Sequence, residues 1–257
     1  MPRKSMQRTT SFWVVPGIFV CTFSLLFVDY VSAQSKKGRG RGFRKPGEVI
    51  TRPDRSGERW VDQLEVGKVA PEFSLPLLWQ DTSSRKTSST QKSANKKTRQ
   101  NVTLRDLRAT QPVVLIFGSF TCPPFRNQLE GVDSVYEQFK DRAQFLFVYV
   151  REAHPDSVLS VIDQNGKERL RKIPQPTDML TRVSNAAICQ RTKDLNIPIA
   201  IDTIDNHVGK AYAGRPNRMV VVGTDGKLLF ITVPSPLGTD ARSLRNWLSK
   251  NLTKSSS

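Results

Sequence analysis

One cysteine of the chain stands at a position where a thiol could do chemistry. Cys122 follows the apolar run 113–118 by four residues and directly precedes Pro123 and Pro124. Because proline is well tolerated in the first turn of a helix, this pattern predicts a helix that begins just after the cysteine. The free amide groups and positive dipole end of such a helix favour a thiolate, so we expect the pKa of Cys122 to be lowered. Cys122 is therefore a candidate nucleophile, and the alternative is a buried, inert thiol.

The other cysteines are weaker candidates. Phe125 occupies the third position after Cys122, so no Cys-x-x-Cys pair is present and a dithiol isomerase is disfavoured. Cys21 lies in an apolar N-terminal run and is assigned no chemistry. Cys189 falls on a predicted helix, where it is either a resolving cysteine or a small buried residue. The chain has two histidines, far apart, and no metal site is expected.

A second set of reactive side chains follows the apolar run 145–150. His154 comes four residues after that run, and Glu152 stands two residues before the histidine. If the two apolar runs form parallel strands, their carboxyl ends meet at one sheet edge and bring His154 near Cys122. An imidazole with a pKa of about 6.5 can donate or accept a proton near neutral pH. Glu152 could orient this histidine or relay protons.

The elements that must position these groups alternate between strand and helix. Runs 113–118 and 145–150 are continuously apolar, as expected of strands buried on both faces. Between them, apolar residues at spacings of four and three mark one stripe of a helix: Phe125, Leu129, Val132, Tyr136 and Phe139. A second helix is expected over 177–193, with Thr177 as its cap. Its inward-facing stripe would consist of Leu180, Val183, Ala187 and Ile188.

The C-terminal part continues this pattern. Its expected elements are a strand at 199–202, a helical turn or two at 207–213, a hairpin of strands 219–223 and 228–232, and a helix at 240–252. The turn Thr224-Asp225-Gly226-Lys227 carries the hairpin signal, and His207 is expected to face solvent. This order predicts an α/β fold with a central mixed β-sheet flanked by helices.

The chain is strongly basic, with 40 Lys and Arg against 23 Asp and Glu and a formal net charge of +17. Much of the excess lies in segments 35–45 and 81–100, which have no hydrophobic period and are expected to be flexible. Such segments could contact an anionic membrane or polymer. The positive charge of these segments therefore indicates what the protein contacts rather than the chemistry of its site.

The N-terminus indicates export. Basic residues precede the apolar run 12–28 and a small-residue site follows it, so residues 1–33 are expected to be a signal peptide or membrane anchor. We expect an exported protein, periplasmic or anchored facing outside the cytoplasm. The predicted order is then a flexible basic linker at 34–59, a folded domain at 60–252 with a flexible insertion at 81–100, and a disordered tail at 253–257.

Two motifs make the chain resemble the iodothyronine deiodinase family. The stretch GSFTCPPF at 118–125 matches the family's active-site motif, in which selenocysteine stands where this chain has Cys122. The stretch YVREAHP at 149–155 contains the family's Glu-Ala-His core. The resemblance extends over roughly residues 66–252 and implies a thioredoxin-like fold.

A broader likeness concerns the start of the domain. Residues 67–75 resemble the first strand of redoxins of the TlpA and peroxiredoxin type, which implies an N-terminal redoxin-type β extension carrying the insertion 81–100. By the same analogy, Pro216 would be the cis-proline that faces the reactive cysteine.

The family resemblance implies reductive removal of iodine or another halogen from a small aromatic substrate. Cys122 would be the nucleophile, with His154 and Glu152 as the proton relay. Supporting roles would fall to the hydroxyls of Ser119 and Thr121 near the thiol, Tyr149 beside the relay, Pro216, and Arg218 as a holder of an anionic group. No bound cofactor is expected, and the reductant would be an external thiol or a thioredoxin-like donor. A second copy of the chain is a further candidate partner.

Three features differ from the family pattern: Cys122 in place of selenocysteine, Phe120 in place of a cysteine, and Pro176 in place of a histidine of the substrate pocket. Two other functions therefore stay open. One is a thiol peroxidase, in which Cys122 attacks a peroxide and Cys189 or an outside thiol resolves the product. The other is a non-catalytic envelope-associated binding protein on a thioredoxin scaffold.

Overall fold

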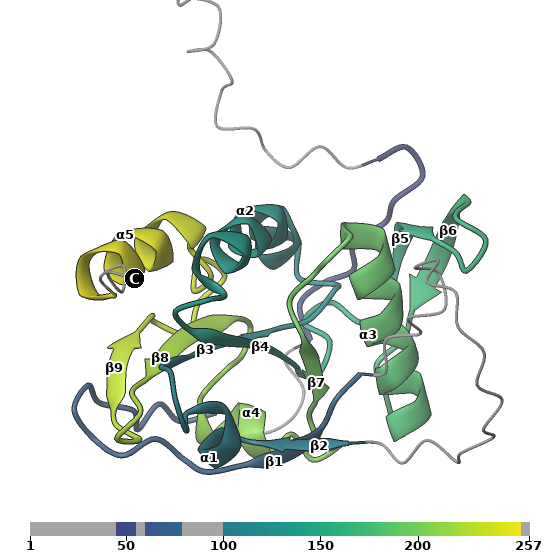
Figure 1. Cartoon of the computed structure of the whole chain (residues 1–257). Helices are drawn as coiled ribbons and strands as arrows, with labels where there is room; N and C mark the ends of the chain where they lie inside the picture. Colours follow the sequence, from purple (N-terminus) through teal and green to yellow (C-terminus); the bar gives the residue numbers. More distant parts are fainter. Residues whose placement is uncertain (1–44, 55–59, 79–99, 253–257) are drawn as a thin grey trace, which may run out of the picture. The chain divides into compact units, whose positions relative to one another are not determined.

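The computed structural model describes residues 45–54, 60–78 and 100–252 (Figure 1). The predicted signal peptide or anchor, the predicted tail 253–257, and all of the insertion 81–100 except Gln100 lie outside the described residues. Among the helices that are described, none is long and apolar enough to cross a membrane.

A five-stranded mixed sheet forms the centre of the fold, in the order β7-β4-β3-β8-β9. Its strands are β3 (Val113–Gly118), β4 (Gln144–Tyr149), β7 (Ile199–Ile201), β8 (Arg218–Val222) and β9 (Leu228–Ile231). β3, β4 and β7 run parallel, whereas β8 and β9 are each antiparallel to their neighbours. The two apolar runs thus form adjacent parallel strands, as predicted, and their carboxyl ends meet at one edge.

Helices cover both faces of this sheet (Figure 1). The helices are α1 (Leu104–Leu107), α2 (Pro123–Phe139), α3 (Met179–Lys193), α4 (His207–Ala211) and α5 (Ala241–Asn251). α2 and α5 lie on one face and α1 and α4 on the other, while α3 stands beside β7 (Figure 1). This arrangement confirms the predicted thioredoxin-like α/β fold.

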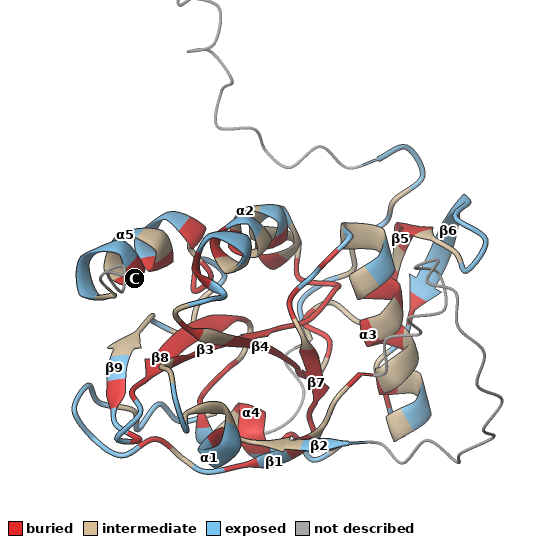
Figure 2. Cartoon of the chain, viewed as in Figure 1, coloured by how far each residue is buried: buried red, intermediate tan, exposed pale blue. Residues whose placement is uncertain are grey.

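The side chains of each central strand contribute alternately to two hydrophobic cores, because successive side chains of a strand point to opposite faces of the sheet. Val114 and Ile116 pack with the apolar residues of α2, α3 and α5. Val113, Leu115 and Phe117 pack on the other face. All five are fully buried, so β3 appears red along its whole length in Figure 2.

The expected N-terminal β extension is present. β1 (Ser74–Pro76) pairs antiparallel with β2 (Asn101–Thr103), and the segment between them contains the insertion. Single bridges join this extension to the central domain, from Val69 to Lys227 and from Leu77 to Ala200.

The predicted flexible linker 34–59 is wrong over residues 45–54, and its other residues lie outside the described part of the chain. Residues 45–54 pack on the domain, since Val49 and Val158 exchange two backbone hydrogen bonds of 2.8 Å. The Asp54 N–H also donates to the Ala153 carbonyl at 2.8 Å. Composition suggested a flexible segment here, but these long-range backbone contacts hold it in place.

A hairpin that the sequence reasoning did not predict follows β4. It consists of β5 (Ser157–Ile162) and β6 (Glu168–Ile173), which pair antiparallel. Its turn contains Asn165-Gly166, and Gly166 has a φ of +74°. An Asn-Gly turn between two runs with alternating apolar residues is a hairpin signal that could have revealed it.

The helix α3 differs in two respects from the helix predicted over residues 177–193. α3 begins at Met179, and its cap is Asp178, whose Oδ1 accepts the Thr181 N–H at 2.9 Å, rather than Thr177. Leu180, expected on the buried stripe, is 72% exposed. Ile188 of the same stripe is buried as expected.

Candidate active site

Cys122 lies at the N-terminus of α2, as predicted. It is the N-cap residue in an extended conformation, followed by Pro123 and Pro124 in the first turn. Gly118 permits the tight path from β3, because a Cβ atom there would lie 2.5 Å from the ring of Phe125. The sequence thus brings the thiol to the carboxyl edge of the sheet.

A pocket of about 960 Å³ contains this cysteine. Its lining also includes two more of the predicted site residues, His154 and Pro216. The Arg215–Pro216 peptide bond is cis, as the redoxin likeness implied. The parallel strands therefore bring Cys122 and His154 to one cavity, although they are 32 positions apart in sequence.

The prediction that the pKa of Cys122 is lowered is wrong. The thiol is 1% exposed, and this burial raises its pKa above the ordinary value. The Phe125 N–H, the Asn217 side chain and the charge of Arg126 all favour the thiolate, but they do not outweigh the burial. Asn217 Nδ2 donates to Cys122 Sγ at 3.5 Å. The resting cysteine is therefore a protonated thiol at neutral pH, because loss of solvent disfavours the charged form.

Glu152 is completely buried and accepts four hydrogen bonds. Its Oε1 accepts from the Tyr149 hydroxyl at 2.5 Å and from Asn185 Nδ2 at 3.1 Å. Its Oε2 accepts from Thr121 N at 3.1 Å and Thr121 Oγ1 at 2.7 Å. Burial raises the pKa of Glu152, while these donors oppose the shift. Burial likewise raises the pKa of Tyr149 well above its ordinary value.

His154 does not contact this carboxylate directly, contrary to the simplest form of the predicted relay. Its Nδ1 lies 2.8 Å from the Thr51 carbonyl oxygen. Because a carbonyl oxygen can only accept, Nδ1 carries a proton and Nε2 is the nitrogen left for proton exchange. The link to Glu152 runs through Thr121, whose hydroxyl donates to Glu152 and accepts from the His154 main-chain N–H at 3.0 Å.

The hydroxyls of Ser119 and Thr121 therefore join two loops rather than contacting the sulfur. Ser119 Oγ accepts the Ala153 N–H at 3.0 Å, beside the bond from His154 to Thr121. Both hydroxyl residues are fully buried. They fix the loop that carries His154 against the loop that carries Cys122.

Arg218 is not among the residues that line this pocket, which contradicts its predicted role as the holder of an anionic substrate group. It is 2% exposed and forms two hydrogen bonds with the Asp62 carboxylate, from Nη1 at 2.7 Å and Nη2 at 2.9 Å. Its Nε donates to the Thr232 carbonyl at 2.8 Å. Every nitrogen of the guanidinium is occupied, and Arg218 instead holds Asp62 at the pocket.

Comparison with known proteins fits this geometry. The family model for iodothyronine deiodinase matches residues 57–252, which contain the whole described site except the contributions of segment 45–54. The chain belongs to the iodothyronine deiodinase family.

Two curated relatives show the extent of the family likeness. The chain is 30% identical to the type II iodothyronine deiodinase of Mus musculus over 154 residues, which cover 57% of this chain and 54% of that one. It is 32% identical to the thyroxine 5-deiodinase of Gallus gallus over 148 residues, with the same coverage. The chain thus spans about half the length of the curated relatives it matches.

Solved structures show lower similarity than these relatives. The peroxidoxin BcpB from Mycobacterium tuberculosis has a TM-score of 0.48 at 16% identity, covering 74% of this chain and all of that one. A putative protein disulfide isomerase from Bacteroides thetaiotaomicron has a TM-score of 0.47 at 16% identity, covering 74% and 91%.

Several residues of this deiodinase-family site were missed by the sequence reasoning. Arg215 lines the pocket, and its guanidinium bonds the main-chain carbonyl of Asp54. Arg151 forms an ion pair with the Asp54 carboxylate. Trp60 lines the same pocket. Asp54 is far from both arginines in sequence, so no local pattern links it to them. The only available signal was the position of Arg215 directly before the expected cis-proline, which could have placed Arg215 at the site.

The remaining candidates lie outside the pocket. Cys189 is fully buried in α3 and does not line the cavity, and burial raises its pKa far above the ordinary value. His207 is exposed at the start of α4, as expected. Within the described ranges, no group of three or more His, Cys, Asp or Glu could hold a metal ion.

Proposed function

We propose that this deiodinase-family protein is a thiol-dependent oxidoreductase that removes iodine or another halogen from an aromatic substrate. The observation that carries this proposal is the shared pocket of Cys122 and His154, with the nucleophile at a helix N-terminus and the histidine Nδ1 held by Thr51. This arrangement supplies a nucleophile and a proton carrier in the same pocket.

The chemistry begins with Cys122 Sγ as the electron donor to iodine. The carbon–iodine bond breaks, and its electron pair stays on the ring carbon, which takes a proton. Cys122 becomes a sulfenyl iodide. One external thiol displaces iodide to form a mixed disulfide, and a second restores the Cys122 thiol and releases a disulfide. The sum converts an aryl iodide and two thiols into the arene, iodide, a proton and one disulfide.

His154 explains how a buried thiol can react. Burial keeps Cys122 protonated at rest, so a base must accept its proton before attack. With Nδ1 donating to Thr51, the Nε2 atom is free to accept that proton and later deliver it to the ring carbon. Glu152 and Thr121 act as positioning residues, because they hold the backbone of the loop that carries His154.

The pocket suits an aromatic ring that bears an anionic group. Its volume of about 960 Å³ and its apolar residues, including Trp60, Pro123 and Pro216, fit a ring system. Arg215 lies on the lining, unlike Arg218, and we assign it the anion-holding role expected of Arg218, although its guanidinium also pairs with Asp54.

The reductant in this proposal is an external thiol or a thioredoxin-like donor. Cys189 is buried in α3, away from the lining of the pocket, and is a poor partner for Cys122. Export and contact of segments 35–45 and 81–100 with an anionic surface are also proposals, supported by the sequence pattern.

Iodide release from iodinated phenols with excess dithiol tests the function. Wild-type protein and the control Cys189→Ala are expected to release iodide in proportion to dithiol consumed, whereas Cys122→Ser releases none and keeps its circular dichroism spectrum. Iodide release by Cys122→Ser would refute the proposal. Consumption of hydrogen peroxide by the wild type without iodide release would instead identify a thiol peroxidase.

A further inference from the structure

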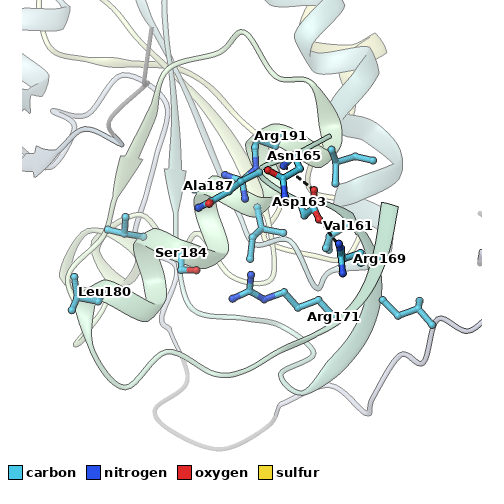
Figure 3. Close-up of a pocket in the computed structure, with 14 residues that line it drawn as sticks. Val161, Asp163, Asn165, Arg169, Arg171, Leu180, Ser184, Ala187 and Arg191 are labelled. Atoms are coloured by element: carbon cyan, nitrogen blue, oxygen red, sulfur yellow. Dashed lines mark hydrogen bonds and ion pairs between the residues drawn. The ribbon is translucent and has the colours of Figure 1, made fainter. Parts of the chain in front are cut away.

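A second hollow lies between α3 and the β5–β6 hairpin (Figure 3). Its volume is about 720 Å³, within the range of small-molecule sites. It shares no lining residue with the pocket that contains Cys122. A ligand in this hollow would therefore not occupy the pocket of Cys122.

The helical wall of this hollow is a stripe of α3 that is apolar except for Ser184 and Arg191. Residues of α3 at spacings of three and four form it: Leu180, Val183, Ser184, Ala187, Ile188 and Arg191. The spacing is that of one helix face. Leu180, at its outer end, is 72% exposed, whereas Ile188 is buried. An apolar helix face of this kind normally packs against the core, yet here its N-terminal part borders an open hollow.

The hairpin wall is cationic. Arg169 and Arg171 alternate with the buried Ile173 along β6, so all three point to the same face, toward α3. Val161 of β5 lies opposite Arg169 and adds an apolar side chain to that face. In Figure 3, the Arg171 side chain extends from the hairpin toward α3 across the hollow.

The charges at the rim are not balanced. Asp163 is the acidic residue of the lining, and its carboxylate accepts a hydrogen bond of 2.6 Å from Arg169 Nε. The charge of Asp163 is therefore paired with Arg169. Within the described residues, neither Arg171 nor Arg191 forms an ion pair or a side-chain hydrogen bond. Two guanidinium groups thus stand beside an apolar wall without a counter-charge from that part of the chain.

We propose that this hollow binds an amphipathic carboxylate, with its apolar body along the α3 stripe and its carboxylate on Arg171 and Arg191. Guanidinium groups match carboxylates in geometry and charge. The apolar wall favours an aliphatic or aromatic body over a purely polar anion. The basic segment 81–100 carries the same sign of charge as the rim and is a poor occupant.

Calorimetric titration of the full chain with decanoate, below its micelle-forming concentration, tests this site. Decanol, which has the same chain without the charge, is the matched ligand. Arg171→Gln and Arg191→Gln are each expected to weaken decanoate binding about tenfold, because a charge-assisted hydrogen bond is lost. Leu180→Ser is expected to weaken it several-fold through lost apolar contact. Arg105→Gln, an equally charged change at an exposed position of α1, should leave binding unchanged.

Arg171, Arg191, Leu180 and Arg105 are exposed, so circular dichroism is expected to match wild type in the variants at these four positions. Saturable decanoate binding with one site per chain, weakened by Arg171→Gln and not by Arg105→Gln, supports the proposal. It is overturned if decanoate does not bind, if decanol binds as tightly, or if Arg215→Gln in the Cys122 pocket removes binding while Arg171→Gln does not.

Discussion

The buried carboxylate of Glu152 offers a sharp test of how the site is held together. Its two oxygens accept four hydrogen bonds, from Tyr149, Asn185 and twice from Thr121. In Glu152→Gln, the amide oxygen can satisfy the donors on one side only. Each oxygen of the carboxyl group, ionised or protonated, keeps a lone pair that can accept, whereas the amide nitrogen only donates and would face two other donors in a fully buried place.

The expected loss of stability follows from these contacts. Two hydrogen bonds disappear, and each donor left unsatisfied in the interior costs about 1–3 kcal/mol. The pairs share one group, so their effects are not additive, and we expect the free energy of unfolding to fall by about 2–4 kcal/mol. Because Thr121 also holds the backbone of His154, halide release should slow as well.

The pH dependence has a definite sign. Burial raises the pKa of Glu152 in the folded state. A raised pKa means that the contribution of this group to stability is complete below its unfolded value, about 4.3, and is lost as pH rises through the folded value. The deficit of Glu152→Gln relative to wild type is therefore largest in acid and becomes smaller as pH rises.

Urea unfolding at pH 4.5, 6 and 8, followed by tryptophan fluorescence, measures this deficit. Glu130→Gln is the matched control, since Glu130 is exposed on α2 and should change stability by less than about 0.5 kcal/mol. A Glu152→Gln deficit no larger than that of the control, or one that grows with pH, would refute the reasoning.

Three further outcomes are expected. Alkylation of Cys122 by iodoacetamide in the free protein should accelerate only above the pH range of an ordinary cysteine, because burial raises the pKa; a plateau below pH 8 would contradict this. Asp62→Asn should lower stability by about 2 kcal/mol near pH 7, since buried Arg218 loses its counter-charge. Burial opposes the ionisation of Asp62, but the hydrogen bonds and charge of Arg218 outweigh it, so the pKa of Asp62 is lowered. The stability deficit of Asp62→Asn should therefore vanish as pH falls through this lowered pKa. A deficit that stays constant down to pH 2 would contradict this. Gly118→Ala should cost about 1–3 kcal/mol and reduce halide release, because its methyl group would displace Phe125; urea unfolding indistinguishable from wild type would exclude that clash.

The sequence was informative where the signal is local or follows from strand direction. The apolar runs predicted β3 and β4, and the prolines predicted the start of α2 at Cys122. Parallel strands then required His154 to emerge at the same sheet edge, and both residues line one pocket.

It failed where burial or long-range contact decides the result. The helix position of Cys122 suggested an acidic thiol, but the packing around it, which excludes solvent, is not encoded within a few residues. Arg218 and Arg215 have similar chemistry and each pairs with an aspartate, so only the folded structure shows that Arg215 lines the pocket and Arg218 does not. The stripe that contains Leu180 was identified correctly as a helix face, but periodicity does not say what that face meets.

A single turnover without external thiol tests the central claim most directly, the claim that Cys122 is the nucleophile of the pocket. Wild-type protein mixed with excess iodinated phenol should yield one dehalogenated phenol per chain and then stop, with oxidised Cys122 in the peptide mass spectrum. Cys122→Ser should yield none, and Cys189→Ala should match wild type. Repeated turnover without thiol, or product from Cys122→Ser, would contradict the account.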